Sequence, residues 1–243
     1  MKTISISSYK GGTGKTASAV NLAYDLMVQG ARVLVIDADP QANCTYMFTN
    51  LQDGSKSFAD LFAGTKIKSC IYRTKFPRID IVKGSSQTEE IQGNAETLKE
   101  TLSEVSGEYD YCVIDCHPSM QLPTIAAITA SDILLIPYKA DGYGNSGIEI
   151  LEDYIEQIKT EFNPYLRYFI FVTQFSGTRS QMSILRDIME KHNYPILETV
   201  ITYREAVNSA TKIRKPLLKH RKNSTVTQDY MQLTEEVKRI LEE

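Results

Sequence analysis

The sequence predicts a doubly wound α/β fold in which a mostly parallel β-sheet is flanked by helices. Short apolar runs alternate along the chain with segments of helical periodicity, as expected of right-handed βαβ units. Several runs are continuously apolar (VLVI, CVI, ILLI and FIFV), which is typical of strands that are covered on both faces. A glycine-rich segment at 8–16 joins the first expected strand to the first expected helix.

Each expected element follows from local periodicity and from turn residues. The expected strands lie at 3–8, 33–36, 79–82, 111–114, 133–136 and 168–173. The expected helices lie at about 15–29, 89–105, 121–129, 147–159, 181–191 and 226–242. Residues 50–78 show no clear pattern. Because we find no repeat, low-complexity tract or linker, we expect residues 1–243 to form one domain.

The overall composition is that of an ordinary globular protein, with 42% hydrophobic and 23% charged residues. No apolar run is long enough to span a bilayer, and residues 1–8 are too short for a signal peptide. We therefore expect a cytoplasmic protein. The four cysteines do not suggest a disulfide framework or a zinc site, and we expect reduced thiols.

The net charge of −3 conceals a strong asymmetry along the chain. Residues 167–222 contain 11 Lys or Arg and 4 acidic residues, whereas the rest of the chain carries a net charge of −10. A basic sector on an acidic protein suggests a polyanionic partner.

The glycine-rich segment reads SYKGGTGKT and has the context of a phosphate-binding loop, between a strand and a helix. Backbone N–H groups and the start of the helix are expected to surround the phosphates of a nucleotide. The residues expected there are Gly11, Gly12, Thr13, Gly14, Lys15, Thr16 and Ala17. Lys15 is expected to contact the β- and γ-phosphates, and the Thr16 hydroxyl to bind Mg²⁺. The first glycine of the general pattern is replaced by Tyr9, and a second lysine, Lys10, follows it.

Three carboxylates directly follow expected strands, where ligands bind in parallel sheets. Asp37 and Asp39 follow the strand at 33–36, and Asp115 follows the strand at 111–114. We expect Asp115 and Asp37 to serve Mg²⁺ together with Thr16. Asp37 and Asp39 lie two residues apart and can face one pocket, where a cation and an attacking water would separate them. The alternative is a simple turn at each strand end, which suits Asp37 better than Asp39.

Together these motifs resemble the ParA/MinD family of deviant Walker ATPases. The specific matches are KGGTGKT (10–16), VLVIDADPQAN (33–43) and YDYCVIDCHPS (109–119). Weaker matches are LLIPYKADGYGNSG (134–147), FSGTRSQ (175–181) and EAVNSATKIRKPL (205–217). The sequence looks more like the small, Soj-type ParA partition ATPases than like MinD. His117 stands where the family often has a second proline, and we expect a neutral, packed imidazole there.

The resemblance implies an ATPase that uses ATP and Mg²⁺, is slow and is stimulated by a partner. Lys10 would be the signature lysine, which crosses an ATP-dependent homodimer to the nucleotide of the other subunit. Asp39 would orient the attacking water, so that Lys10, Lys15 and Asp39 form the catalytic set. Thr173, Gln174 and Tyr203 are the candidate adenine contacts.

The resemblance also implies non-specific binding of duplex DNA, a ParB-like stimulating partner and association with the nucleoid. The expected DNA contacts are Arg179, Lys212, Arg214, Lys215, Lys219, Arg221 and Lys222. One alternative is a MinD-like membrane-associated ATPase, which needs a basic amphipathic terminal helix. Residues 230–243 are amphipathic but carry four glutamates, so we expect this segment to pack on the sheet and no membrane to bind. A P-loop metabolic ligase or an iron–sulfur reductase is the other alternative.

Overall fold

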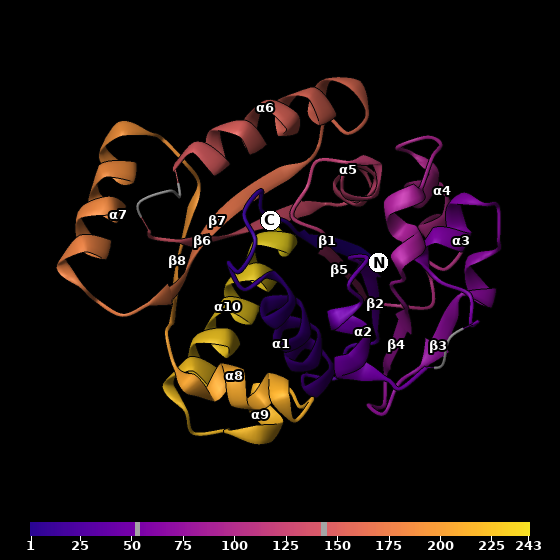
Figure 1. The fold of residues 1–243 in the computed structure, drawn as a ribbon, viewed down its shortest axis with the longest axis horizontal. Coiled ribbons are helices and arrows are strands. Elements are labelled where there is room, and N and C mark those ends of the chain that lie inside the picture. The colour runs from indigo at the N-terminus through magenta and orange to yellow at the C-terminus, as the bar shows by residue number, and fades with distance from the viewer. Residues whose placement is uncertain (52–53, 142–144) are drawn as a thin grey trace.

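The computed structural model describes residues 1–51, 54–141 and 145–243. In this part of the chain, one sheet runs through the molecule in the strand order β3-β4-β2-β5-β1-β6-β7-β8 (Figure 1). The strands are β1 (Lys2–Ile6), β2 (Val33–Ala38), β3 (Ile71–Arg73), β4 (Ile79–Val82), β5 (Tyr111–Cys116), β6 (Ile133–Lys139), β7 (Arg167–Phe175) and β8 (Ile196–Thr202). All neighbours pair in parallel except β3, which runs antiparallel to β4 at one edge.

Helices cover both faces of this sheet (Figure 1). They are α1 (Lys15–Val28), α2 (Asn43–Phe48), α3 (Phe58–Phe62), α4 (Thr97–Ser103), α5 (Leu122–Thr129), α6 (Asn145–Glu161), α7 (Arg179–Lys191), α8 (Glu205–Lys212), α9 (Leu217–His220) and α10 (Thr225–Glu242), with short 3₁₀ turns at Ile67–Ser69 and Ser86–Glu90. Helices α1, α2, α8, α9 and α10 contribute to the core on one face, and α3 to α7 to the cores on the other.

The alternation of side chains explains the continuously apolar strands. In β2, Val33 and Val35 join the core under α1 and α10, while Leu34 and Ile36 join the core under α3, α4 and α5. Because both faces of the strand are buried, no position in the run is left for a polar residue. The predicted doubly wound α/β fold is confirmed.

The structure differs from the sequence prediction mainly in short elements and at the sheet edges. The predicted helix at 89–105 is wrong in its first half, because α4 begins at Thr97 and Gly93 breaks the chain with φ +138°. The edge strands β3 and β8 and the short helices α2, α3, α8 and α9 were not predicted. The predicted packing of the C-terminal segment is confirmed, since α10 packs against α1 and β8. No helix in the described residues is both long and apolar enough to cross a bilayer.

The parallel register brings the chemistry-bearing residues to one edge of the sheet. The strands β1, β2 and β5 are adjacent, and Asp115 lies directly opposite both Ile6 and Asp37. The glycine-rich segment follows β1 at the same edge, so it lies above the carboxylates that end β2 and β5.

Candidate nucleotide-binding site

The glycine-rich loop wraps around the N-terminus of α1 and is held from the side by β7. Gly12 and Gly14 adopt φ values of +73° and +97°, which glycine reaches without strain. The Thr173 hydroxyl donates to the carbonyl of Thr13 (2.8 Å), and Gln174 Nε2 donates to the carbonyl of Gly12 (2.6 Å). The loop is therefore fixed with its N–H groups available at the positive end of a 14-residue helix.

A cavity of about 450 Å³ opens in front of this loop. It is large enough for a small-molecule cofactor. Its wall includes most of the residues that the sequence assigned to nucleotide binding, namely Gly11, Gly12, Gly14, Lys15, Thr16, Ala17, Asp39, Thr173 and Tyr203. Thr13 is buried behind the loop, where its hydroxyl pairs with that of Ser8 (2.8 Å).

Lys15 is a nearly buried lysine at the base of the loop. Its ammonium group donates to the Lys10 carbonyl at 3.2 Å. Burial lowers the pKa of Lys15, and the carboxylates of Asp115 and Asp39 oppose that shift. A cation in a partly desolvated position beside carboxylates is well placed to receive the charge of a phosphate group.

Asp115 is fully buried, and within the described residues neither of its carboxylate oxygens has a hydrogen-bond partner. Burial and the neighbouring Asp37 raise the pKa of Asp115, while the Thr16 hydroxyl and Lys15 act in the opposite direction. An unsatisfied buried carboxylate beside a threonine hydroxyl suits a hard divalent cation, which supplies the missing positive charge. Thr16 and Asp115 thus fit Mg²⁺, which would neutralise phosphate charge there.

Asp37 has a different environment from Asp115. Both of its oxygens already accept hydrogen bonds, one from Asp39 N and the other from Thr45. Burial raises the pKa of Asp37 to about 6, although these hydrogen bonds oppose the shift. These hydrogen bonds also suit a positioning role for Asp37, and the metal role predicted for it stays a prediction.

Asp39 is the carboxylate that reaches the cavity. It is 8% exposed and lines the cavity opposite the glycine loop, and its Oδ1 accepts a hydrogen bond from Gln41 N (2.8 Å). This is the position expected of a group that orients a water molecule.

Lys10 is held within its own subunit in this structure. Its ammonium group lies 2.6 Å from both carboxylate oxygens of Asp141, which follows β6. Both side chains are partly exposed, so the pair can open toward solvent. The 134–147 motif continues from Asp141 into residues 142–144, which lie outside the described residues.

Tyr203 lies 48% exposed on the far side of the cavity, next to several polar residues that the sequence analysis did not assign. These are Asn43 in α2, Arg204 just before α8, and Asn208 and Thr211 in α8. Three of them lie within the segments 33–43 and 205–217, but the sequence pattern did not identify them as cavity residues. His117 lies half-buried, and its Nδ1 is 3.0 Å from the Ser119 hydroxyl.

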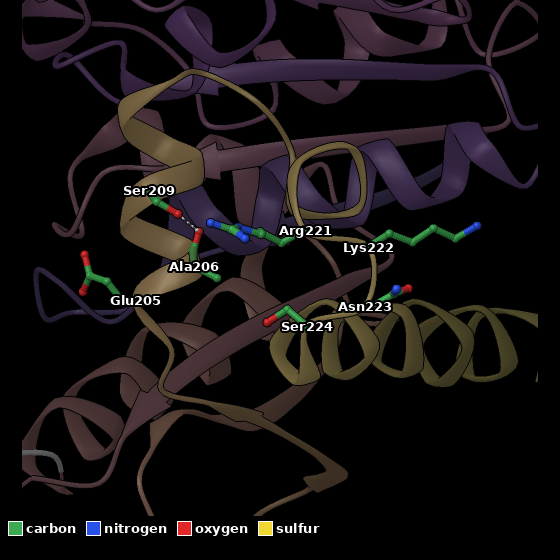
Figure 2. Close-up of a pocket in the computed structure, with 7 residues that line it drawn as sticks. All are labelled: Glu205, Ala206, Ser209, Arg221, Lys222, Asn223 and Ser224. Atoms are coloured by element: carbon green, nitrogen blue, oxygen red, sulfur yellow. Dashed lines mark hydrogen bonds between the residues drawn. The ribbon is translucent and has the colours of Figure 1, made fainter.

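The basic residues do not form one continuous patch. Arg179 begins α7, which packs on the opposite sheet face from α8 and α9 (Figure 1). Arg221 and Lys222 precede α10 beside an open pocket of about 670 Å³ between α8 and α10. Figure 2 shows the Arg221 side chain directed toward α8 and that of Lys222 directed away from it.

Four further cations lie near one another, three of them over the aromatic rings of Tyr46 and Phe76, and we call them the cationic cluster: Lys75, Arg214, Lys215 and Lys219. Lys75 Nζ donates to the Arg214 carbonyl (2.9 Å), and both Lys75 and Lys219 lie over the Phe76 ring. Burial lowers the pKa of Lys75, and its cationic neighbours lower it further. Among the described residues, we find no ion pair between this cluster and a carboxylate.

The loop, the lysine and the strand-end carboxylates around one cavity place the protein in the P-loop class of nucleotide-binding proteins. Comparison with known proteins agrees: the AAA_31 family model, described as an AAA domain, matches residues 1–168. The chromosome partitioning protein ParA of Caulobacter vibrioides is 27% identical over 98% of this chain and 94% of its own length. The chain therefore belongs to the ParA/MinD family of P-loop ATPases.

Two solved structures share the fold. A McdA variant from Cyanothece in complex with ATP has a TM-score of 0.86 and 24% identity, over 98% of this chain and 96% of that one. The cobyrinic acid a,c-diamide synthase of Mycobacterium smegmatis, with an ATP analogue and magnesium, has a TM-score of 0.86 and 20% identity, over 100% and 96%.

Proposed function

We propose that this protein is a ParA-type partition ATPase that binds ATP and Mg²⁺, dimerises and hydrolyses ATP. The observation that carries the ATPase activity is the cavity bounded by Lys15, Thr16 and Asp39, with the unsatisfied Asp115 buried beside it. The fold neighbours whose structures contain ATP, or an ATP analogue and magnesium, support these ligands. The full-length likeness to a chromosome partitioning protein supports the role in DNA partition.

The residues around the cavity have different roles in phosphoryl transfer, which depends mainly on positioning and on charge neutralisation. The loop N–H groups and Lys15 hold the phosphates, and Thr16 and Asp115 would hold Mg²⁺, which would neutralise phosphate charge there. Asp39 accepts a hydrogen bond from the attacking water and directs its lone pair toward the γ-phosphate. Lys10 leaves Asp141 and reaches the phosphates of the partner subunit, so that ATP binding and dimerisation are linked.

The test of hydrolysis is Asp39→Ala, which removes the water-orienting carboxylate and leaves the phosphate loop intact. We expect the variant to bind ATP in titration calorimetry, to accumulate as a dimer in sedimentation analysis, and to release little phosphate. Turnover at the rate of the unmodified protein would show that Asp39 does not orient the water.

The proposed DNA contact rests on the cationic cluster together with Lys212, Arg221 and Lys222. Cations without carboxylate partners attract the phosphates of duplex DNA without reading its sequence. Such a surface binds more tightly when two copies are joined in the ATP dimer, because the second contact becomes intramolecular. A ParB-like protein that stimulates hydrolysis completes the proposed cycle.

A single assay separates this role from its alternatives. Binding to duplex DNA is measured with and without a non-hydrolysable ATP analogue, and anionic vesicles are tested in parallel. We expect analogue-dependent DNA binding that Lys215→Glu with Lys219→Glu removes, while the exposed pair Lys66→Glu with Lys99→Glu leaves it unchanged. Binding to vesicles alone would indicate a MinD-like role, and binding to neither would favour a metabolic enzyme.

A further inference from the structure

Three segments that are distant in sequence meet at the buried carboxylate Asp37. The backbone N–H and the hydroxyl of Thr45 donate to Asp37 Oδ2 at 2.7 and 2.6 Å. Gly84 N donates to the Thr45 hydroxyl oxygen at 3.0 Å. The Thr45 hydroxyl thus uses its one proton on Asp37 and accepts from Gly84, so each group has a satisfied role. These bonds join the ends of β2 and β4 to α2.

Gly84 is also tightly packed against the turn that carries Asp39. A Cβ atom at Gly84 would lie 2.7 Å from the Asp39 carbonyl oxygen and 3.0 Å from Asp37 Cγ. The nearer atom belongs to the backbone, so it cannot move aside as the end of a flexible side chain can. A larger residue at this position would therefore displace the turn.

The Asp39 backbone is held from two sides by this arrangement. Its N–H donates to Asp37 Oδ1 (3.2 Å), and its carbonyl lies against Gly84. Among the described residues, the hydrogen bond found for the Asp39 side chain within its turn is the one that it accepts from Gln41 N. The position of its carboxylate in the cavity is consequently set by the backbone, and the backbone by Asp37, Thr45 and Gly84.

We propose that Thr45 and Gly84 are positioning residues for ATP hydrolysis, which hold Asp39 at the attacking water by fixing Asp37. This inference rests on the proposed role of Asp39. The hydrogen bonds of Thr45 do not involve the glycine loop, so their loss affects the water-orienting group and leaves the phosphate contacts in place. A displacement of about 1 Å in a catalytic group can cost on the order of 100-fold in rate.

The test compares Thr45→Val, which keeps the shape and removes the hydroxyl, with Thr45→Ser, which keeps the hydroxyl. We expect kcat for ATP to fall roughly 10- to 100-fold in Thr45→Val, with affinity for a non-hydrolysable analogue unchanged, and to recover in Thr45→Ser. Gly84→Ala should show the same loss of kcat. Thr101→Val on α4 is the matched control, because among the described residues the Thr101 hydroxyl is found to bond within its own helix, to the Thr97 carbonyl.

A wild-type kcat in Thr45→Val would overturn the proposal, as would an equal loss in Thr45→Ser. If Thr45→Val does not fold, the kcat of Gly84→Ala decides, and an unchanged value overturns the proposal. Asp39→Ala is measured in parallel. If Asp39→Ala turns over ATP normally, the proposed function of Asp39 fails; if it is inactive while Thr45→Val is fully active, only the positioning role fails.

Discussion

Asp25 is an acidic residue in the last turn of α1 that is buried where this helix packs on α10. It is 3% exposed, and among the described residues its Oδ1 has no hydrogen-bond partner. Burial raises the pKa of Asp25 to about 7, against a smaller opposing effect of the Thr234 hydroxyl. We predict that Asp25→Asn stabilises the protein at pH 8 and not at pH 4.

The sign follows from proton binding in the two states. Folded Asp25 keeps its proton up to about pH 7, whereas the unfolded chain loses it near the usual value of 3.8. Between these values the unfolded state binds fewer protons, so the free energy of unfolding falls as the pH rises. The contribution of protonated Asp25 to the free energy of unfolding is therefore fully present below pH 3.8. It is lost as the pH rises through about 7.

The separation of these two pKa values corresponds to about 4 kcal/mol, at 1.36 kcal/mol per pH unit. This is an upper limit, because the asparagine still buries an amide group with an incomplete set of partners. We expect Asp25→Asn to recover about 1–3 kcal/mol at pH 8. In a chain of this size that amounts to a rise in melting temperature of roughly 2–4 °C for each kcal/mol.

The assay is thermal and urea unfolding of both proteins at pH 4 and pH 8. The matched control is Asp153→Asn on α6, where the exposed carboxylate gives no reason for a pH-dependent difference. An effect of Asp25→Asn that is equal at both pH values, or a destabilisation at pH 8, would refute the assigned cause.

Three further predictions concern the nucleotide site and its surroundings. Lys15→Ala should abolish ATP binding because it removes the buried cation at the phosphates; calorimetry that finds unchanged affinity would contradict the site. Asp141→Asn should break the Lys10–Asp141 ion pair and favour dimerisation with an ATP analogue by up to about fivefold in sedimentation analysis, because exposed ion pairs contribute at most about 1 kcal/mol. For the same reason, the melting temperature should change little. Weaker dimerisation would argue that the ion pair is needed in the dimer. Lys75→Ala should reduce the slope of log K against log salt for DNA by about 0.9, and an unchanged slope would remove Lys75 from the contact.

The elements that the sequence predicted are those whose pattern reflects burial on both faces. The central strands β2, β5 and β6 have apolar residues at successive positions because helices cover them on both sides. The edge strand β8 carries an exposed glutamate, Glu198, and mixed polarity, so periodicity gave no clear signal. The three-residue strand β3 is too short to show any period.

The candidate site divides in the same way between local and tertiary information. The loop at 10–16 and the acids at the carboxyl ends of β2 and β5 were predictable because strand, turn and functional residue are consecutive. The pairs Lys10–Asp141 and Thr45–Gly84 join residues 131 and 39 positions apart, and no local sequence pattern predicts these contacts. Asp37 shows the consequence: its place at the end of an apolar run predicted a metal ligand, whereas its hydrogen bonds from Thr45 are revealed only by the folded chain.

The short helix α2 contacts both the carboxylates and the cationic cluster through two consecutive residues. Thr45 bonds to Asp37, and the neighbouring Tyr46 lies under the guanidinium group of Arg214 at 5.3 Å from the ring centroid. Arg214 also bonds to Asn50 just after this helix, and its φ of +53° shows a backbone conformation that side chains and contacts must maintain. A shift of α2 thus changes the surroundings of both groups. Since linkage between binding sites is reciprocal, any gain in DNA affinity on nucleotide binding must be matched by an equal gain in nucleotide affinity on DNA binding.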